Sequence, residues 1–254
     1  MIAILSPAKT LDFEKEVSAE YTLSRLPSQT RELVHTLQKK NSDDLKELMD
    51  ISDNIADLNV ERFQNFKERH TTTNAKQNIF AFKGDVYQGL DAESLSEDDL
   101  KYAQQHVRIL SGLYGLLRPL DIIQPYRLEM GTQLKVNGSG NLYEYWDDAI
   151  TKLLNKDLKD QGDDILVNLA SNEYFRSIQK KKLKARIVEV EFKDFKNGEY
   201  KIISFWAKKA RGMMARYIIQ NRISTVEDLK GFDYDGYSCD HDSSTEDRLV
   251  FLRG

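Results

Sequence analysis

Apolar residues along the chain fall into short runs that alternate with stretches of helical spacing. Short runs rich in β-branched and aromatic residues predict strands, and apolar positions three or four residues apart predict helices. The predicted strands span 2–5, 79–82, 164–169, 187–192, 200–206 and 248–252. The predicted helices span 28–41, 42–49, 52–69, 96–110, 142–159, 207–222 and 225–230. Asn197-Gly198 predicts a hairpin turn within a mixed β-sheet. Interspersed strands and helices without a linker predict a single α/β domain, a mixed sheet flanked by helices, over residues 1–254.

Polar residues stand at the ends of three of these apolar runs. Ligands of open α/β sheets bind at the carboxyl ends of the strands, so these residues are candidates for a pocket. The first run is followed by Ser6, Lys9, Thr10 and Asp12, the second by Lys83, Gly84 and Asp85, and the third ends in Asn168, Ser171 and Tyr174. An ordinary turn with a solvated lysine remains the alternative for the first of these places.

The predicted helix 207–222 carries a basic face. At about 100° per residue, its cations share one arc of about 160°. They are Lys208, Lys209, Arg211, Arg216 and Arg222. Gly212 and Ala215 lie within the arc, so a polyanion such as a phosphate backbone could approach closely. Alternatively, the small residues admit another helix, and the cations pair with acids elsewhere.

The charge of the chain is unevenly distributed. The net charge is −4, but residues 176–222 hold fourteen Lys or Arg and four Asp or Glu, a net charge of +10. The remainder therefore carries −14. This asymmetry is typical of a polyanion site on an acidic body, and it also arises from internal salt bridges.

Two further stretches are candidate sites. Leu110–Asp121 contains Ser111, Gly112, Leu113, Tyr114 and Gly115, followed by Arg118. These glycines loosely resemble the hairpin of a helix-hairpin-helix motif, in which backbone amides contact a phosphate, although a turn between a helix and a strand fits equally well. In Gln124–Gly131, Tyr126, Arg127 and Glu129 follow each other closely, and alternation would place Arg127 and Glu129 on one face.

Several classes of chemistry find no support in the sequence. The four histidines form no zinc-binding spacing, and there is no nucleophile elbow or dinucleotide fingerprint. Cys239 has no basic neighbour that would activate its thiol. We therefore expect no metal site and no cofactor. The amino-terminal residues lack the features of a secretory signal, and no apolar run is long enough to span a membrane, which favours a cytoplasmic protein without a membrane partner.

Taken together, the motifs resemble one family over essentially the whole chain. They are Ser6–Asp12, Ala81–Tyr87, Leu110–Gly115, Arg118–Asp121, Gln124–Gly131, Asn168–Ser171 and Ala207–Gly212. They are similar to those of the bacterial YaaA family of peroxide-stress proteins. The resemblance implies a cytoplasmic α/β protein with the "cantaloupe" fold, a positively charged cleft, helix-hairpin-helix-like DNA binding, and a role in surviving hydrogen peroxide that is tied to limiting free iron. It implies the cleft residues Lys9, Lys83, Arg118, Arg127, Lys208, Lys209 and Arg211, with Ser111–Gly115 as the hairpin.

Three functions remain open from the sequence. The first is DNA binding largely without sequence preference, to plain or distorted duplex, which the +10 segment motivates. The second is an enzyme that acts on a nucleobase, nucleotide or abasic site, with Lys9 as the amine that forms a Schiff base and with Tyr114, Tyr126 and Tyr174 as aromatic residues of the pocket. The third, direct iron binding, has little support because no cluster of suitable ligands stands out.

Overall fold

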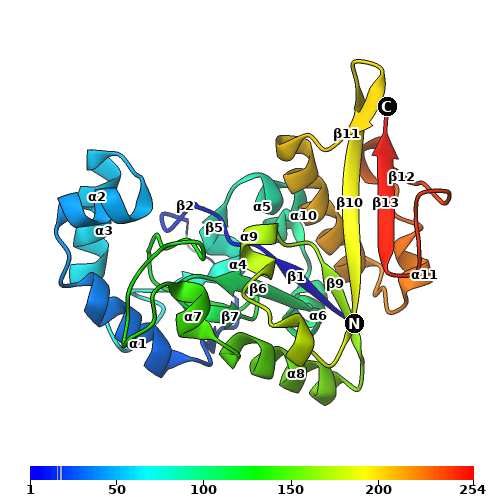
Figure 1. The fold of residues 1–254 in the computed structure, drawn as a ribbon. Helices are drawn as coiled ribbons and strands as arrows, with labels where there is room; N and C mark the ends of the chain where they lie inside the picture. Colours follow the sequence, from blue (N-terminus) through cyan, green and yellow to red (C-terminus); the bar gives the residue numbers. More distant parts are fainter. Residues whose placement is uncertain (16, 18) are drawn as a thin grey trace.

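The computed structural model describes residues 1–15, 17 and 19–254. Within these residues, an eight-stranded sheet has the order β12-β13-β10-β9-β1-β6-β7, with β11 paired to β10 (Figure 1). Its strands are β1 (Ile2–Leu5), β6 (Val107–Ser111), β7 (Gly115–Leu117), β9 (Ile165–Asn168), β10 (Arg186–Lys196), β11 (Glu199–Lys201), β12 (Ser238–Cys239) and β13 (Arg248–Arg253). Strands β13, β10, β9, β1 and β6 run parallel, and β7, β11 and β12 are antiparallel to their neighbours. The predicted α/β fold with a mixed sheet is therefore confirmed.

Strand β1 lies near the centre of this sheet, between β6 and β9. All four of its residues are fully buried. A strand covered on both faces reads as a continuous apolar run, which is why Ile2–Leu5 could be recognised from the sequence. The carboxyl ends of β1 and its parallel neighbour β9 lie together, and the residues that follow them are thereby brought close to each other.

Helices surround the sheet. They are α1 (Pro27–Leu37), α2 (Ser42–Met49), α3 (Asp53–Gln64), α4 (Asn78–Ala81), α5 (Asp85–Leu90), α6 (Glu97–His106), α7 (Leu142–Trp146), α8 (Ala149–Gln161), α9 (Asn172–Phe175), α10 (Ser204–Gln220) and α11 (Val226–Leu229). Helix α10 packs on α5, α6, β1 and β10, while α8 packs on β7 and α9 on β6. Helices α2 and α3 lie at one end of the molecule, and the β10–β11 hairpin projects at the other (Figure 1).

Two small sheets complete the fold. One pairs β2 (Thr10–Leu11) with β5 (Phe82–Lys83), and the other has the order β3-β8-β4. Its strands are β3 (Thr22–Leu23), β8 (Asp121–Ile123) and β4 (Lys76–Gln77). The β2–β5 pair holds the loop after β1 against the loop after β5, and so joins two of the predicted strand exits.

Some predicted elements were wrong in type. Residues 79–82 are mostly the short helix α4, in which the Asn78 side chain donates hydrogen bonds to the carbonyls of Arg118 and Asp121. A short run that is buried all round has no periodicity to distinguish a helix from a strand. Strand β11 ends at Lys201, and the predicted strand 200–206 instead leads into α10 at Ser204.

Other boundaries moved as well. Helix α6 ends at His106, because Val107–Ser111 pairs with β1 and β7 as strand β6. The predicted helix 142–159 is broken into α7 and α8 at Asp147, where φ is 40°. The local signals were more reliable. The capping box at Ser96 and the Asn197-Gly198 turn, with both residues at positive φ, are present as predicted.

Candidate functional site

Most of the polar residues predicted at the ends of the apolar runs line one pocket at the carboxyl ends of β1 and β9. The backbone N–H of Ser171, after β9, donates to Oγ of Ser6, after β1, over 2.9 Å. The Tyr87 hydroxyl of α5 donates to the Ser6 carbonyl over 3.1 Å. The pocket has a volume of about 440 Å³. Its polar lining consists of Ser6, Lys9, Thr10, Lys83, Asp85, Tyr87, Glu129, Ser171, Glu173, Tyr174, Lys208 and Arg211.

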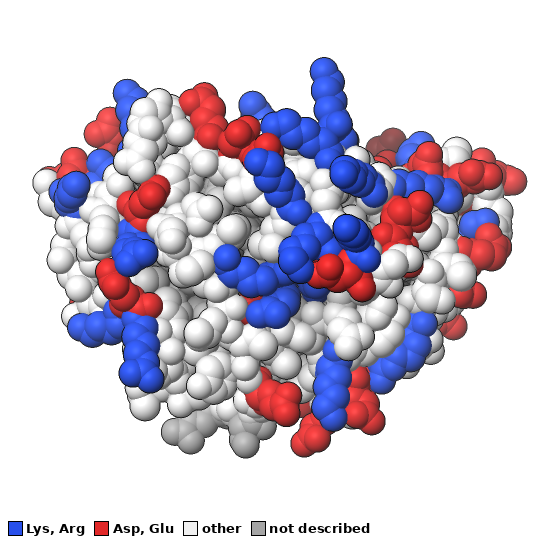
Figure 2. All heavy atoms as spheres, turned by 90° about the horizontal axis from the view of Figure 1, so that it is seen from below, with Lys and Arg blue, Asp and Glu red and all other residues white. Residues whose placement is uncertain are grey.

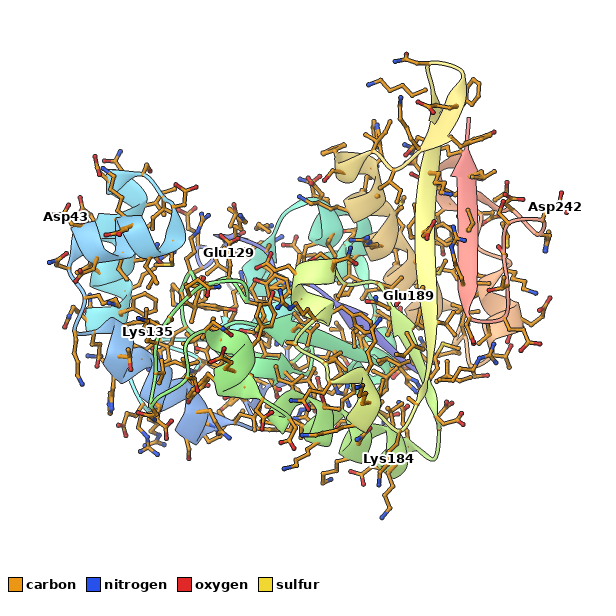
Figure 3. All side chains as sticks on the ribbon, in the orientation of Figure 1. Asp43, Glu129, Lys135, Lys184, Glu189 and Asp242 are labelled. Atoms are coloured by element: carbon orange, nitrogen blue, oxygen red, sulfur yellow. The ribbon has the colours of Figure 1, made fainter. Side chains whose placement is uncertain are left out.

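Glu129 lies between two cations at the edge of this pocket. Its carboxylate is 2.7 Å from Lys9 Nζ and 3.1 Å from Arg127 Nη2. Figure 3 shows Glu129 in the middle of the molecule, between the α2–α3 end and β10. The predicted meeting of Arg127 and Glu129 thus occurs, although the segment is not a strand. The two cations, Lys9 and Arg127, largely neutralise the charge of Glu129, and the Lys9 side chain remains 62% exposed.

Asp12 and Lys83 form a second ion pair beside the pocket. Lys83 Nζ lies 3.2 Å from the Asp12 carboxylate, and buried Lys76 lies 3.9 Å from it. Burial raises the pKa of Asp12, but hydrogen bonds from backbone amides and Lys83 outweigh it, so the net shift is downward. Gly84, at φ +151°, allows the chain to turn here beside the Ala8 side chain.

The five cations of the basic helix face fall into two groups, those that line the pocket and those that pair with acids elsewhere. Lys208 and Arg211 line the pocket, and no ion pair joins either of them to an acid among the residues that the structure describes. Burial lowers the pKa of Arg211 and Glu189 opposes the shift, but a guanidinium stays charged. Arg211 is therefore partly stripped of water without a carboxylate partner.

The other three cations of that face pair with acids from distant segments. Lys209 Nζ lies 3.8 Å from Asp235, Arg216 lies 3.6 Å from Asp91, and Arg222 lies 2.8 Å from Asp99. Arg216 also donates to the carbonyls of Leu90 and Asp91. For these positions the alternative interpretation, internal salt bridging, is correct.

The small residues of α10 serve helix packing. Gly212 and Ala215 are buried, and a Cβ on Gly212 would lie 1.8 Å from the Val86 carbonyl oxygen of α5. Gly89 of α5 is equally close to the backbone of α10, 2.0 Å from the Lys209 oxygen. The prediction that the small residues open the basic face to a polyanion is wrong, because this side of α10 crosses α5 in backbone contact.

The predicted helix-hairpin-helix is absent from Ser111–Gly115, which forms the turn of a β-hairpin between β6 and β7. These five residues are buried, and their polar groups bind within the protein. Ser111 Oγ lies 2.6 Å from the Tyr126 hydroxyl, and the Gly112 carbonyl accepts from Trp146 Nε1. Burial raises the pKa of both Tyr114 and Tyr126. Contact between these glycines and a phosphate is therefore excluded in this conformation.

Two more predicted site residues have internal partners. Arg118 forms an ion pair at 2.8 Å with fully buried Asp121. Asn168 Nδ2 donates to Glu189 over 2.6 Å, and its Oδ1 accepts from the Ala170 amide. Both side chains hold the loops that follow β7 and β9 in place.

Sequence reasoning missed Glu173 and Tyr87, which also line the pocket. Glu173 accepts a hydrogen bond from the Gly131 amide over 2.9 Å and so joins two of the loops. Tyr87 ends the motif Ala81–Tyr87, two residues after Asp85, and Glu173 stands two residues after Ser171, the end of the motif Asn168–Ser171. This closeness to predicted site residues was a usable signal.

A second basic region lies away from the pocket. Lys and Arg side chains gather near the middle of the face seen from below in Figure 2, with acids beside them. This side of the molecule carries α8 and the segment leading to Lys184 (Figures 1 and 3). Lys152 and Lys182 both pair there with Asp148, at 2.9 and 3.0 Å. Charge alone therefore does not single out the pocket.

A sequence model of the family described as "Peroxide stress protein YaaA" matches residues 1–243. The chain belongs to this family. Within residues 1–15, 17 and 19–254, no group of three or more His, Cys, Asp or Glu side chains is arranged to hold a metal ion. In the same part of the chain, none of the helices has both the length and the apolar character needed to cross a bilayer.

Proposed function

We propose that this member of the peroxide stress family binds DNA largely without sequence preference, by holding a backbone phosphate in the pocket at the ends of β1 and β9. The observation that carries the proposal is Arg211. A desolvated guanidinium without a carboxylate partner is costly, and an anion in the pocket would offset that cost. Lys208, one turn earlier on α10, lines the same pocket and offers a second charge to that anion.

The rest of the lining is compatible with an anion such as a phosphate. Two of the three carboxylates are occupied, Glu129 by Lys9 and Arg127 and Glu173 by the Gly131 amide. Lys9 and Lys83 are 62% and 46% exposed at the rim, where flanking phosphates would compete for them with Glu129 and Asp12. Contacts to phosphate carry no sequence information, which makes the binding unspecific.

Fluorescence anisotropy with a plain duplex at several salt concentrations tests the proposal. Lys208→Glu/Arg211→Glu should weaken binding at least tenfold, and the slope of log affinity against log salt should become shallower by about one, since the two cations share one phosphate and each phosphate contact contributes about 0.9. Lys181→Glu/Lys184→Glu is the matched control, with the same charge change at exposed lysines away from the pocket. An equal loss in both variants would mean plain electrostatics, and no loss in either would refute the site.

A second function is favoured by the Lys9–Glu129 pair at 2.7 Å. In this alternative, Glu129 accepts the proton that the Lys9 ammonium must lose, the free amine attacks the aldehyde of an abasic sugar, and the aldehyde oxygen leaves as water to give the Schiff base. Borohydride reduction in the presence of abasic DNA would trap the adduct, and Lys9→Arg is the control that keeps the charge. The absence of a trapped species would leave DNA binding as the only one of these two functions.

The link to limiting free iron is likewise a proposal, and metal analysis after anaerobic iron loading tests it.

A further inference from the structure

Large apolar side chains are exposed together where the β10–β11 hairpin meets the start of α10. We call this surface the aromatic platform. Its members are Phe195 (53% exposed), Tyr200 (43%), Ile202 (55%), Phe205 (47%) and Trp206 (37%). Exposed apolar side chains scattered singly are ordinary, but a contiguous group of this kind marks a binding surface.

Ring contacts and the end of β13 join four of these side chains, Phe195, Tyr200, Phe205 and Trp206, into one surface. The Phe195 and Tyr200 rings lie 5.2 Å apart across the hairpin, and the Phe205 and Trp206 rings lie 4.9 Å apart. Strand β13 connects the two pairs. The Tyr200 hydroxyl donates to the carbonyl of Gly254, which directly follows β13, over 2.9 Å. The guanidinium of Arg253, the last residue of β13, lies 4.5 Å from the Trp206 ring centre. The β10–β11 hairpin, which carries Phe195 and Tyr200, projects from the body of the molecule (Figure 1).

Among the residues that the structure describes, two lysines without an acidic partner lie beside the platform, although the hairpin also holds Glu199, which is paired with Lys201. Lys196 flanks it in the hairpin, and Lys208 follows Phe205 by one helical turn. In the described part of the chain, no ion pair neutralises either lysine. Lys208 also lines the pocket at the ends of β1 and β9. Lys208 therefore links the platform, along α10, to the proposed phosphate site.

We propose that the aromatic platform stacks the unpaired bases of DNA whose backbone is held in the pocket. Exposed rings beside cations are the combination that binds single strands, because every base offers a flat face to an aromatic side chain. Bases within an intact duplex are already stacked on each other and cannot occupy the platform. The platform would thus make the protein prefer DNA with unpaired segments. This inference rests on the proposed DNA binding.

Three probes separate stacking from charge: a short oligothymidylate, an abasic strand of the same length, and a plain duplex. The wild-type protein should bind the oligothymidylate more tightly than the abasic strand, which has the same phosphates. Tyr200→Ala/Phe205→Ala should weaken oligothymidylate binding about tenfold for each ring removed and leave the other two affinities unchanged. Tyr21→Ala, which removes an equally exposed ring far from the platform in sequence, is the control.

The outcomes distinguish this inference from the function on which it rests. Lys208→Glu/Arg211→Glu should weaken binding of all three probes. Equal wild-type affinity for the two single strands, or an unchanged Tyr200→Ala/Phe205→Ala variant, would overturn the stacking while DNA binding stands. Binding of the platform to phosphatidylserine vesicles, or a dimer that the variant abolishes, would also overturn it. If no probe binds, the proposed function itself fails.

Discussion

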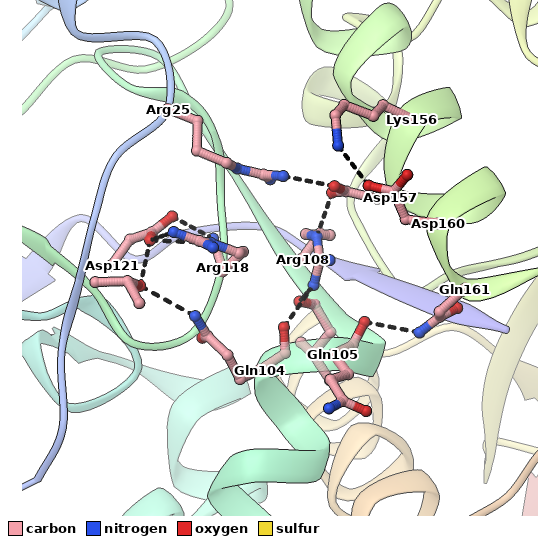
Figure 4. Close-up of polar contacts among 12 residues, drawn as sticks. Arg25, Gln104, Gln105, Arg108, Arg118, Asp121, Lys156, Asp157, Asp160 and Gln161 are labelled. Atoms are coloured by element: carbon pink, nitrogen blue, oxygen red, sulfur yellow. Dashed lines mark hydrogen bonds and ion pairs between the residues drawn. The ribbon is translucent and has the colours of Figure 1, made fainter.

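Replacing Asp157 with Asn should strongly destabilise the fold, because Asp157 is the acid of a buried charge cluster between α8 and β6 (Figure 4). Its carboxylate lies 2.6 Å from Arg108 and 2.5 Å from Arg25. The side chains of Asp157 and Arg108 are each 6% exposed. Arg108 also donates to the carbonyls of Gln104 and Val107. The substitution leaves two cations without a counter-charge in a place that water hardly reaches.

Removing one partner of a buried pair costs about 3–5 kcal/mol. The lower end applies here, because the two carbonyls still bind Arg108 and the amide oxygen of Asn retains one acceptor. A loss of about 3 kcal/mol lowers the Tm of a chain of this size by roughly 6–12 °C. Burial raises the pKa of Asp157, but Arg25 and Arg108 together lower it by more than burial raises it. The net shift of this pKa is therefore downward. The stabilisation is therefore present above about pH 4 and is lost as the pH falls through the lowered pKa.

Urea denaturation at neutral pH measures the effect. Asp160→Asn is the matched control, since Asp160 lies one turn further along α8 and pairs with Lys156 while 58% exposed. Exposed pairs contribute about 0–1 kcal/mol, so the control should barely change the midpoint. A loss below about 1 kcal/mol in Asp157→Asn, or one no larger than in the control, would refute the reasoning.

Three further predictions follow from single contacts. Gly212→Ala should cost at least about 2 kcal/mol in urea denaturation, because the new Cβ would overlap the Val86 carbonyl of α5; an unchanged midpoint contradicts the close helix crossing. Glu129→Gln should free Lys9 and raise duplex affinity several-fold, with a salt slope steeper by about one; weaker binding would show that Glu129 itself contacts the ligand. Burial lowers the pKa of His70, whereas an unfolded histidine titrates near pH 6.5. The unfolded chain therefore takes up this proton first, and stability should fall from pH 7.5 to 5.5 by less in His70→Gln than in the wild type; an identical pH dependence would exclude His70 as a cause.

Much of the pocket could be predicted because its signals are local. Ser6 and Ser171 each follow an apolar strand closely, and parallel strands bring such positions to one edge of a sheet. Lys83 also follows an apolar run, but the antiparallel β2–β5 pair brings it to the pocket. The predicted fold class followed from the same alternation of runs and helical spacings. The Asn197-Gly198 turn and the capping box at Ser96 depend only on the conformation of a few consecutive residues, and both are present.

The errors arose where an element's environment decides its role. Residues 79–82 are apolar on every side, so their helical form depends on the bonds that Asn78 makes with the loop after β7. The glycines of the 111–115 turn resemble a hairpin whose backbone amides contact a phosphate, but the tertiary structure buries them between β6, β7 and Trp146. A glycine in a sequence shows that the backbone has freedom, and only the packing shows which neighbour uses the space.

The sequence by itself determined the α/β order, the buried central strand, the strand-exit loops and the positive charge of α10, since each depends on composition or on periodicity within one segment. Only the tertiary structure decided which charges remain available. Arg216 and Arg222 meet Asp91 and Asp99, which precede them by more than a hundred residues, whereas Lys208 and Arg211 turn into the pocket. The free energy of a charge depends on the distant groups that the fold brings within a few ångströms of it, and no local pattern records those groups.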